Sequence, residues 1–407
     1  MSIYELDGVI RAYAWGSRTS IPALLGRAPG AEPAAELWLG AHPDDPSRVV
    51  GHGATLDKLI ASDPQGLLGR VVVDRFGPQL PFLLKLLAAE TALSIQVHPN
   101  LAQARAGFAA EDARGVPRES PARNYHDANH KPELLCALTE FDALCGFRPV
   151  DATLRLLDAL DIAALAPYRH RLASTGLRAA FTALLELDEP APLADAVAAA
   201  LPRLAGTEWA TLGTALRRVA SDFPGDRGVA VALLLNFVRL APGEAIFLGA
   251  GNVHSYLHGT GVEIMANSDN VLRCGLTGKH IDVPELLRIV DFAELADPRW
   301  PDEGTGFGHD FRVPVADFAL GSASLDAYRS AGQPAGSCTT ATADRPHLLL
   351  CTSGAATVEV PRTSLELRPG GAVFVPASEP AFTLNGTGET FLATVGDLAP
   401  NPSTPHT

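Results

Sequence analysis

The stretch Ser94-Ile95-Gln96-Val97-His98-Pro99 alternates polar and apolar side chains from one residue to the next. A period of two predicts a β-strand, with Ser94, Gln96 and His98 on one face and like-facing Cα atoms about 6.6 Å apart. An amide and an imidazole placed in this way can converge on one ion. The competing interpretation is a solvated strand face, although the approach to this stretch, residues 81–89, is strongly apolar.

Short apolar runs of strand length occur on both sides of this stretch. Residues 81–87 and 133–138 form two of them, and two Pro-Gly turns lead into apolar runs at 245–248 and 372–375. Many short strands separated by Gly and Pro turns favour a sandwich or a jelly roll. The repeated Pro-Gly turn hints at two related barrels, so we expect a mainly β fold.

The pattern changes between residues 150 and 240, where Ala and Leu dominate and apolar residues recur at helical spacing. Leu193, Val197 and Leu201 follow one another at intervals of four, which places them on one helix face. We therefore predict a helical insertion here and one further helix near 283–289. The expected division is a discontinuous β domain at 1–149 and 241–310, a helical domain at 150–240, a C-terminal jelly-roll domain at 311–399 and a flexible tail at 400–407.

Composition narrows the range of partners. The chain has 407 residues, and its 32 basic and 46 acidic residues give a net charge of −14. Nucleic acid is an unsuitable partner for such a chain, because its binders need a basic footprint. The longest strongly apolar stretch, 229–240, is too short to span a bilayer, so no membrane partner is expected. Five scattered cysteines without a CxxC pair fit a reducing, cytoplasmic location.

Two further segments carry groups that can join Gln96 and His98 at a metal ion. Alternation around Pro132 places Lys131 and Glu133 on one side of a predicted strand, and His254 shares a face with Tyr256 after a Gly-rich turn. One amide, one carboxylate and two imidazoles form a mixed nitrogen and oxygen set that suits zinc. A surface ion pair for Lys131 and a core position for His254 are the competing interpretations, and spacing alone does not separate an open catalytic site from a closed structural one.

More charged residues surround these motifs. Glu263, Asp269 and Arg273 follow His254 closely in the chain, and any of them could form an ordinary structural ion pair. Lys85 lies inside the apolar run 82–87. A buried ammonium needs either a buried carboxylate or a bound anion as its partner.

Taken together, these blocks resemble the signature of the type I mannose-6-phosphate isomerases, a zinc-dependent cupin family. The resemblance implies cupin-type jelly-roll barrels plus an α-helical domain. It is poorest in the helical block and from about residue 311 onward, where the C-terminal barrel is expected to be structural or interfacial. The matching blocks occur in family order at residues 13–17 (YAWGS), 36–43 (ELWLGAHP), 93–99, 130–135, 141–149 (FDALCGFRP), 249–257 and 267–273.

The resemblance implies a reversible aldose–ketose isomerisation of D-mannose 6-phosphate and D-fructose 6-phosphate through a cis-enediol(ate). The family's catalytic arginine matches Arg273, which we expect to stabilise charge, because a guanidinium stays protonated and is a poor base. One Zn²⁺ per chain is expected. By motif, its ligands would be Gln96, His98, Glu133 and His254.

Other roles stay open at this stage. The candidates for the proton carrier are Glu263, Asp269, His130 and Lys131. The expected phosphate side is Lys85, Ser94 and Lys131, with Trp15 and Tyr256 as walls of the pocket. The alternative functions are another metal-dependent cupin enzyme, such as an oxygenase or a different sugar isomerase, and a non-enzymatic sugar-binding cupin. The additional Gln96 argues against the oxygenase. The oligomeric state is not determined by these patterns, and a monomer is compatible with them.

Overall fold

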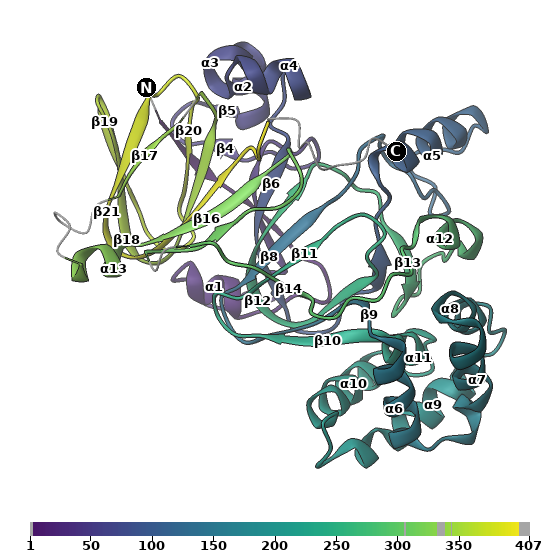
Figure 1. The fold of residues 1–407 in the computed structure, drawn as a ribbon. Helices are drawn as coiled ribbons and strands as arrows, with labels where there is room; N and C mark the ends of the chain where they lie inside the picture. Colours follow the sequence, from purple (N-terminus) through teal and green to yellow (C-terminus); the bar gives the residue numbers. More distant parts are fainter. Residues whose placement is uncertain (1–2, 305–306, 332–337, 343, 399–407) are drawn as a thin grey trace.

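Two antiparallel β-sheets and a group of helices make up the described part of the chain, residues 3–304, 307–331, 338–342 and 344–398, in this computed structural model (Figure 1). The helices between β9 (Phe141–Phe147) and β10 (Leu235–Leu240), from α6 (Val150–Leu160) to α11 (Gly228–Val231), lie together at one end of the molecule (Figure 1). The expected fold class, mainly β with a helical insertion, is confirmed. The tail predicted to be flexible, 400–407, lies outside the described residues.

The first sheet contains the strands expected around the metal motif. Its longest strand, β12, pairs along one half with β6 and β8 and along the other half with β7 and β9. The runs predicted at 81–87, 133–138 and 245–248 form β6, β8 and β11. The strands of this sheet are β2 (Val9–Arg11), β3 (Glu36–Gly40), β6 (Phe82–Ala89), β7 (Ile95–Val97), β8 (Glu133–Ala137), β9 (Phe141–Phe147), β10 (Leu235–Leu240), β11 (Ala245–Leu248), β12 (His254–Ala266), β13 (Leu272–Gly275) and β14 (Arg299–Trp300).

The second sheet joins C-terminal strands to three strands from the N-terminal part of the chain. Tyr4 pairs with Phe374, and Leu6 pairs with Val49. The predicted domain boundaries stay a prediction, but these pairings place β1 beside β20, with β4 and then β5 next to it. Leu6 of β1 and Val49 of β4 enter a core shared by both sheets. The strands are β1 (Tyr4–Asp7), β4 (Arg48–Val49), β5 (Ala54–Thr55), β15 (Asp310–Phe311), β16 (Ala319–Ser324), β17 (Cys338–Ala341), β18 (His347–Val360), β19 (Thr363–Leu367), β20 (Ala372–Val375) and β21 (Ala381–Thr394).

The helical block ends earlier than the sequence pattern indicates. Its last six residues, 235–240, form β10, which pairs with β9, because a short apolar run looks alike in a buried helix and a buried strand. The helix predicted near 283–289 is α12. The α-helices are α1 (Ser20–Leu24), α2 (Leu56–Ser62), α3 (Pro64–Leu68), α4 (Arg70–Phe76), α5 (Leu101–Ala113), α6 (Val150–Leu160), α7 (Ala166–Thr175), α8 (Leu177–Leu185), α9 (Ala191–Ala200), α10 (Ala210–Asp222), α11 (Gly228–Val231), α12 (Val283–Ile289) and α13 (Leu325–Ser330).

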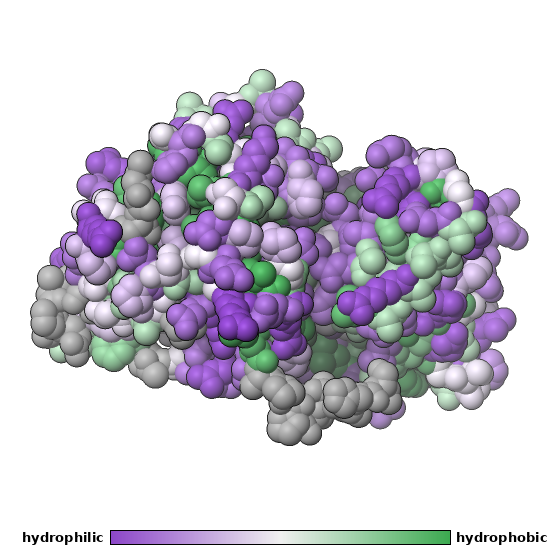
Figure 2. Space-filling view, turned by 90° about the horizontal axis from the view of Figure 1, so that it is seen from above, coloured by the Kyte–Doolittle hydropathy of each residue, from purple (hydrophilic) through white to green (hydrophobic). Residues whose placement is uncertain are grey.

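The face of the molecule shown in Figure 2 is mostly polar. Hydrophilic side chains predominate on this face, and a hollow separates a larger from a smaller part of the molecule (Figure 2). Within the described ranges, we find no helix with the length and apolar character needed to cross a membrane.

Candidate active site and metal centre

Two imidazoles and one carboxylate meet inside the first sheet. The Nε2 atom of His98 lies 3.5 Å from Oε1 of Glu133, and Nε2 of His254 lies 3.4 Å from Oε2 of the same carboxylate. Both Nε2 atoms and Oε2 are buried and have no hydrogen-bond partner among the described residues. Buried polar atoms are rarely left without partners. Three of them facing one another fit a cation, and this donor set suits zinc.

Main-chain carbonyl groups orient both imidazoles. Nδ1 of His98 lies 2.8 Å from the carbonyl oxygen of Asn270, and Nδ1 of His254 lies 2.9 Å from that of Asn252. Since a carbonyl can only accept, each Nδ1 carries the proton and each Nε2 keeps its lone pair for a metal. Burial also lowers the pKa of His98 to about 4, so this imidazole is neutral at pH 7.

Glu133 is held in its ionised form. Burial acts to raise its pKa, but the Lys131 ammonium and the two histidines outweigh burial and hold the pKa well below its usual range. Nζ of Lys131 lies 3.1 Å from Oε1 of Glu133. The two residues therefore lie on one side, as the alternation indicated, and form an ion pair, which was the competing interpretation for Lys131, although this pair is not at the surface. The ionised carboxylate is available to a metal ion.

Gln96 lies beside the metal centre in the strand register. It pairs with His254 on one side and with Arg273 on the other, so β7 sets an amide between an imidazole and a guanidinium. The Gln96 side chain makes no hydrogen bond to any described residue. Its part as a fourth ligand stays a prediction.

A second buried polar network lies around Lys85. Its ammonium is 2.9 Å from Oε2 of Glu263 and 3.6 Å from Oε1 of Glu36. The Tyr256 hydroxyl donates to Glu263 at 2.8 Å, and the Trp38 indole N–H donates to Glu36 at 2.6 Å. Burial acts to lower the pKa of Lys85, but the carboxylates outweigh it and raise the pKa, so the ammonium stays charged.

Three of the expected site residues therefore belong to this network. Lys85 and Tyr256 are tied to Glu263 and are buried. Burial raises the pKa of Glu263, and Lys85 opposes that rise. The expectation that Lys85 faces a phosphate stays a prediction, since its charge is already met by carboxylates.

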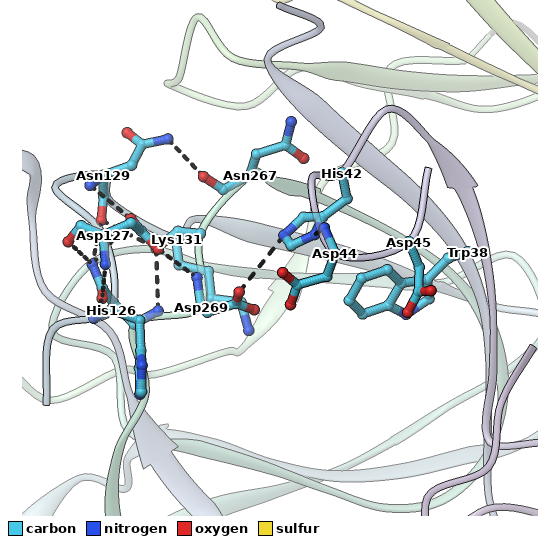
Figure 3. Close-up of polar contacts among 12 residues, drawn as sticks. Trp38, His42, Asp44, Asp45, His126, Asp127, Asn129, Lys131, Asn267 and Asp269 are labelled. Atoms are coloured by element: carbon cyan, nitrogen blue, oxygen red, sulfur yellow. Dashed lines mark hydrogen bonds and ion pairs between the residues drawn. The ribbon is translucent and has the colours of Figure 1, made fainter. Parts of the chain in front are cut away.

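An open cleft of about 770 Å³ holds the other acid–base candidates. His130, Asp269 and His42 are among its lining residues. Figure 3 shows the His42 and Asp269 side chains pointing toward one another, with His42 Nε2 3.9 Å from Asp269 Oδ2. The backbone N–H of Asp269 donates to the carboxylate of Asp127 at 2.8 Å, which fixes the start of the segment that leads to Arg273.

Two cations that follow the metal motif in the chain form no ion pair with a described carboxylate. Neither Arg273 nor the Lys279 ammonium forms an ion pair or side-chain hydrogen bond with a described residue. Burial lowers the pKa of Arg273, and repulsion by Arg273 lowers the pKa of Lys279, so the two charges lie close together. Such a pair favours an anionic ligand.

The remaining residues expected in the pocket, Trp15 and Ser94, make few contacts that bear on a role at the substrate. Trp15 stacks on Tyr13 with ring centroids 5.7 Å apart, and it packs against the cluster that contains Tyr256. Ser94 is half-buried and makes no side-chain hydrogen bond within the described ranges. Their roles at a substrate stay predictions.

Comparisons with known proteins agree with this geometry. A family profile, "Phosphomannose isomerase type I, catalytic domain", matches residues 3–150. The chain is 40% identical over 394 residues to the mannose-6-phosphate isomerase of Escherichia coli K12, a match that covers 94% of this chain and 97% of that protein. This chain belongs to the type I mannose-6-phosphate isomerase family.

More distant relatives extend the agreement. The mannose-6-phosphate isomerase of Bos taurus is 34% identical over 421 residues and covers 93% of this chain and 94% of its own length. The crystal structure of the Salmonella typhimurium enzyme bound to fructose 6-phosphate and zinc superposes with a TM-score of 0.88 at 37% identity, over 98% of this chain and 100% of that one. A further zinc-bound structure has a TM-score of 0.88 at 36% identity. The cupin-type fold expected from the resemblance to this isomerase family is confirmed.

Several residues around the site were not identified from the sequence. Asp317 lies in the cleft with His130 although 187 positions separate them in the chain, and nothing in the pattern indicated that contact. Asn252 and Asn270 act through their carbonyl groups, which sequence patterns do not reveal. The signal available for Lys279 was its position six residues after Arg273 in the chain.

Proposed function

We propose that this isomerase family member interconverts D-mannose 6-phosphate and D-fructose 6-phosphate at a zinc site. The observation that carries the proposal is the group of three buried, unpartnered ligand atoms on His98, Glu133 and His254. The related E. coli and bovine proteins are mannose-6-phosphate isomerases. These two relatives are isomerases, so the comparison does not favour the alternatives of an oxygenase or a non-enzymatic sugar-binding cupin.

His98, Glu133 and His254 would hold the zinc ion, with Gln96 as the fourth ligand. When bound, zinc supplies positive charge that polarises substrate oxygen atoms and stabilises negative charge on them. Glu133 reaches the metal already ionised, and His98 is neutral, so these two groups need to release no proton at pH 7 to bind the ion.

Isomerisation moves one proton between C2 and C1, and the cleft offers two carriers for it. His130 and Asp269 line the cleft, whereas Glu263 is paired with Lys85 and accepts from Tyr256. Lys131 is tied to Glu133, where its charge maintains the carboxylate. These positions favour His130 or Asp269 as the proton carrier over Glu263 and Lys131.

The phosphate and the enediolate both require positive charge. Arg273 and Lys279 supply it without a competing carboxylate, and we assign them to the anionic end of the substrate together with Lys131. Arg273 is also opposite Gln96 in the strand register, which supports a position for its guanidinium on the side of the metal centre. Lys85 acts indirectly, because its charge neutralises Glu263 and Glu36. The proposed wall of the substrate pocket is completed by Ser94, Trp15 and Tyr256.

A small sugar phosphate is the proposed partner, and the cytoplasm is the proposed location. The five cysteines are unpaired, which fits a reducing compartment. The Salmonella typhimurium relative binds fructose 6-phosphate together with zinc, which supports the same ligand for this chain.

A coupled assay tests this function. We expect purified zinc-loaded protein to convert mannose 6-phosphate to fructose 6-phosphate, and to show little conversion with glucose 6-phosphate in place of mannose 6-phosphate. Conversion of glucose 6-phosphate at the higher rate would indicate a different sugar isomerase. No conversion of either sugar by protein of verified zinc content would refute the proposal.

A further inference from the structure

His130 contacts a carboxylate from the C-terminal part of the chain. Its Nε2 atom lies 3.0 Å from Oδ2 and 3.1 Å from Oδ1 of Asp317. The Asp317 side chain is 9% exposed, and no other hydrogen bond or ion pair links its carboxylate to a described residue. Both residues line the cleft. A carboxylate this buried needs a partner, and His130 is the one present.

The fold holds Asp317 firmly in place. Asp317 precedes the fully buried Phe318, in the loop between β15 and β16. The backbone N–H of Gly396, just beyond β21, donates to the carbonyl of Ala316 at 3.1 Å. A Cβ atom on Gly396 would lie 2.4 Å from the carbonyl oxygen of Val315 and 2.7 Å from that of Phe318, so the two segments touch through their backbones. This loop is therefore a rigid extension of the C-terminal sheet.

His130 is anchored on its other side. Its backbone N–H donates to the side chain of Asn129 at 3.0 Å, and Asn129 donates in turn to the carbonyl of Asn267 at 2.9 Å. The second ring nitrogen of His130, Nδ1, has no hydrogen-bond partner among the described residues. A histidine with one nitrogen bonded to a buried carboxylate and the other free has the arrangement of a general base with its orienting acid.

We propose that Asp317 is a positioning residue that prepares His130 for proton transfer, so that the C-terminal β domain supplies part of the active site. The proposal rests on the isomerase function above and selects His130 from the possible proton carriers. The Asp317 carboxylate accepts a hydrogen bond from Nε2–H of His130, so the lone pair of the imidazole is on Nδ1. The negative charge of Asp317 stabilises the imidazolium that forms when Nδ1 takes up a proton.

The proton transfer balances within the substrate and this one imidazole. Nδ1 takes the proton from C2 of the aldose, and the electron pair of the C2–H bond forms the C1=C2 bond of the enediol(ate). The π electron pair of the C1=O bond moves to O1, which takes up the proton of the O2 hydroxyl, and Nδ1 then returns its own proton to C1 as the carbonyl forms at C2. His130 ends the turnover in its starting protonation state, and Asp317 stays ionised throughout.

The chain offers a matched control for this pair. His309 and Asp302 form a second histidine–carboxylate pair, with Nδ1 2.7 Å from Oδ2, in a different cavity. Asp302→Asn removes the same kind of charge from the same kind of partner without entering the cleft. The two variants together separate an effect on His130 from a general effect on folding.

The experiment measures kcat, KM, zinc content and melting temperature for the zinc-loaded variants. We expect Asp317→Asn to lower kcat by about 10- to 100-fold, because misplaced general bases lose much of their contribution, and to leave KM within about twofold. Zinc content should match that of the wild type. Asp302→Asn should keep the wild-type kcat. Asp317→Glu, which keeps the charge but moves it by one methylene, should give an intermediate kcat.

Coupling to His130 completes the test. In a His130→Gln background, adding Asp317→Asn should lower kcat no further, since both act on one step. A wild-type kcat in Asp317→Asn, an equal loss in Asp302→Asn, or full activity in His130→Gln would overturn the proposal while leaving the isomerase function intact. If Asp317→Asn does not fold, a wild-type kcat in Asp317→Glu would overturn it. An inactive wild-type protein would instead refute the proposed function.

Discussion

Replacing Lys85 by methionine should destabilise the protein strongly, because it leaves buried carboxylates without their cation. The Lys85 side chain is 6% exposed and lies 2.9 Å from Glu263 and 3.6 Å from Glu36. Removing one partner of a buried ion pair costs about 3–5 kcal/mol. We expect Lys85→Met to lower the free energy of unfolding by an amount in that range, near 3 kcal/mol if Glu263 takes up a proton.

The sign of the pH dependence follows from Glu263. Burial already raises its pKa, and loss of Lys85 raises that pKa further, so the folded variant binds a proton more strongly than the unfolded chain does. Stability then falls as pH rises. The penalty of Lys85→Met should therefore be smaller at pH 5 than at pH 8. In Lys85→Met/Glu263→Gln the amide still accepts from Tyr256, and the double variant should recover at least half of the loss.

Urea unfolding followed by tryptophan fluorescence checks this, with free zinc held constant because bound ligand adds to stability. The wild type, Lys85→Met and the double variant would be compared at pH 5 and pH 8. A loss below about 1 kcal/mol, the value of an exposed pair, would refute the assignment of Lys85 to this network. A double variant no more stable than Lys85→Met would refute it as well.

Two other predictions concern charge. Arg273→Lys keeps the charge but loses the planar fork, so kcat should fall by about 100-fold with zinc content unchanged; a wild-type kcat in a steady-state assay would remove Arg273 from the mechanism. Burial lowers the pKa of His347 to about 4 from its ordinary 6.5, so the folded state loses up to about 3 kcal/mol between pH 6.5 and pH 4 as the unfolded chain gains a proton. His347→Gln should flatten the pH dependence of urea unfolding in that window, and an unchanged slope would show that His347 does not cause it.

The sequence predicts helices and strands well where the apolar residues recur with a single clear period. Alternation around Gln96 and Glu133 led to β7 and β8, and the Pro-Gly turns led to β11 and β20. The convergence of His98, Glu133 and His254 was anticipated from their donor types and from the resemblance to the isomerase family, because alternation alone decides only which face of its own strand a side chain occupies. The prediction failed at 235–240, since a short apolar run does not distinguish a buried strand from a buried helix.

The sequence pattern did not predict which distant segments contact one another. The need of Lys85 for a partner was clear from its apolar surroundings, but the choice between Glu263 and a bound anion depends on the register of β6 against β12. Likewise, Leu6 pairs with Val49 beside the C-terminal strands, and Asp317 reaches His130, only because the two sheets pack together. Such contacts depend on the assembled fold.

Reconstitution with zinc tests the central claim most directly. Metal-free protein, verified by elemental analysis, would be titrated with zinc while isomerisation of mannose 6-phosphate is followed. The site built from His98, Glu133 and His254 predicts negligible activity without metal, and a linear rise that saturates at about one zinc per chain. Full activity in the verified metal-free protein would contradict this account.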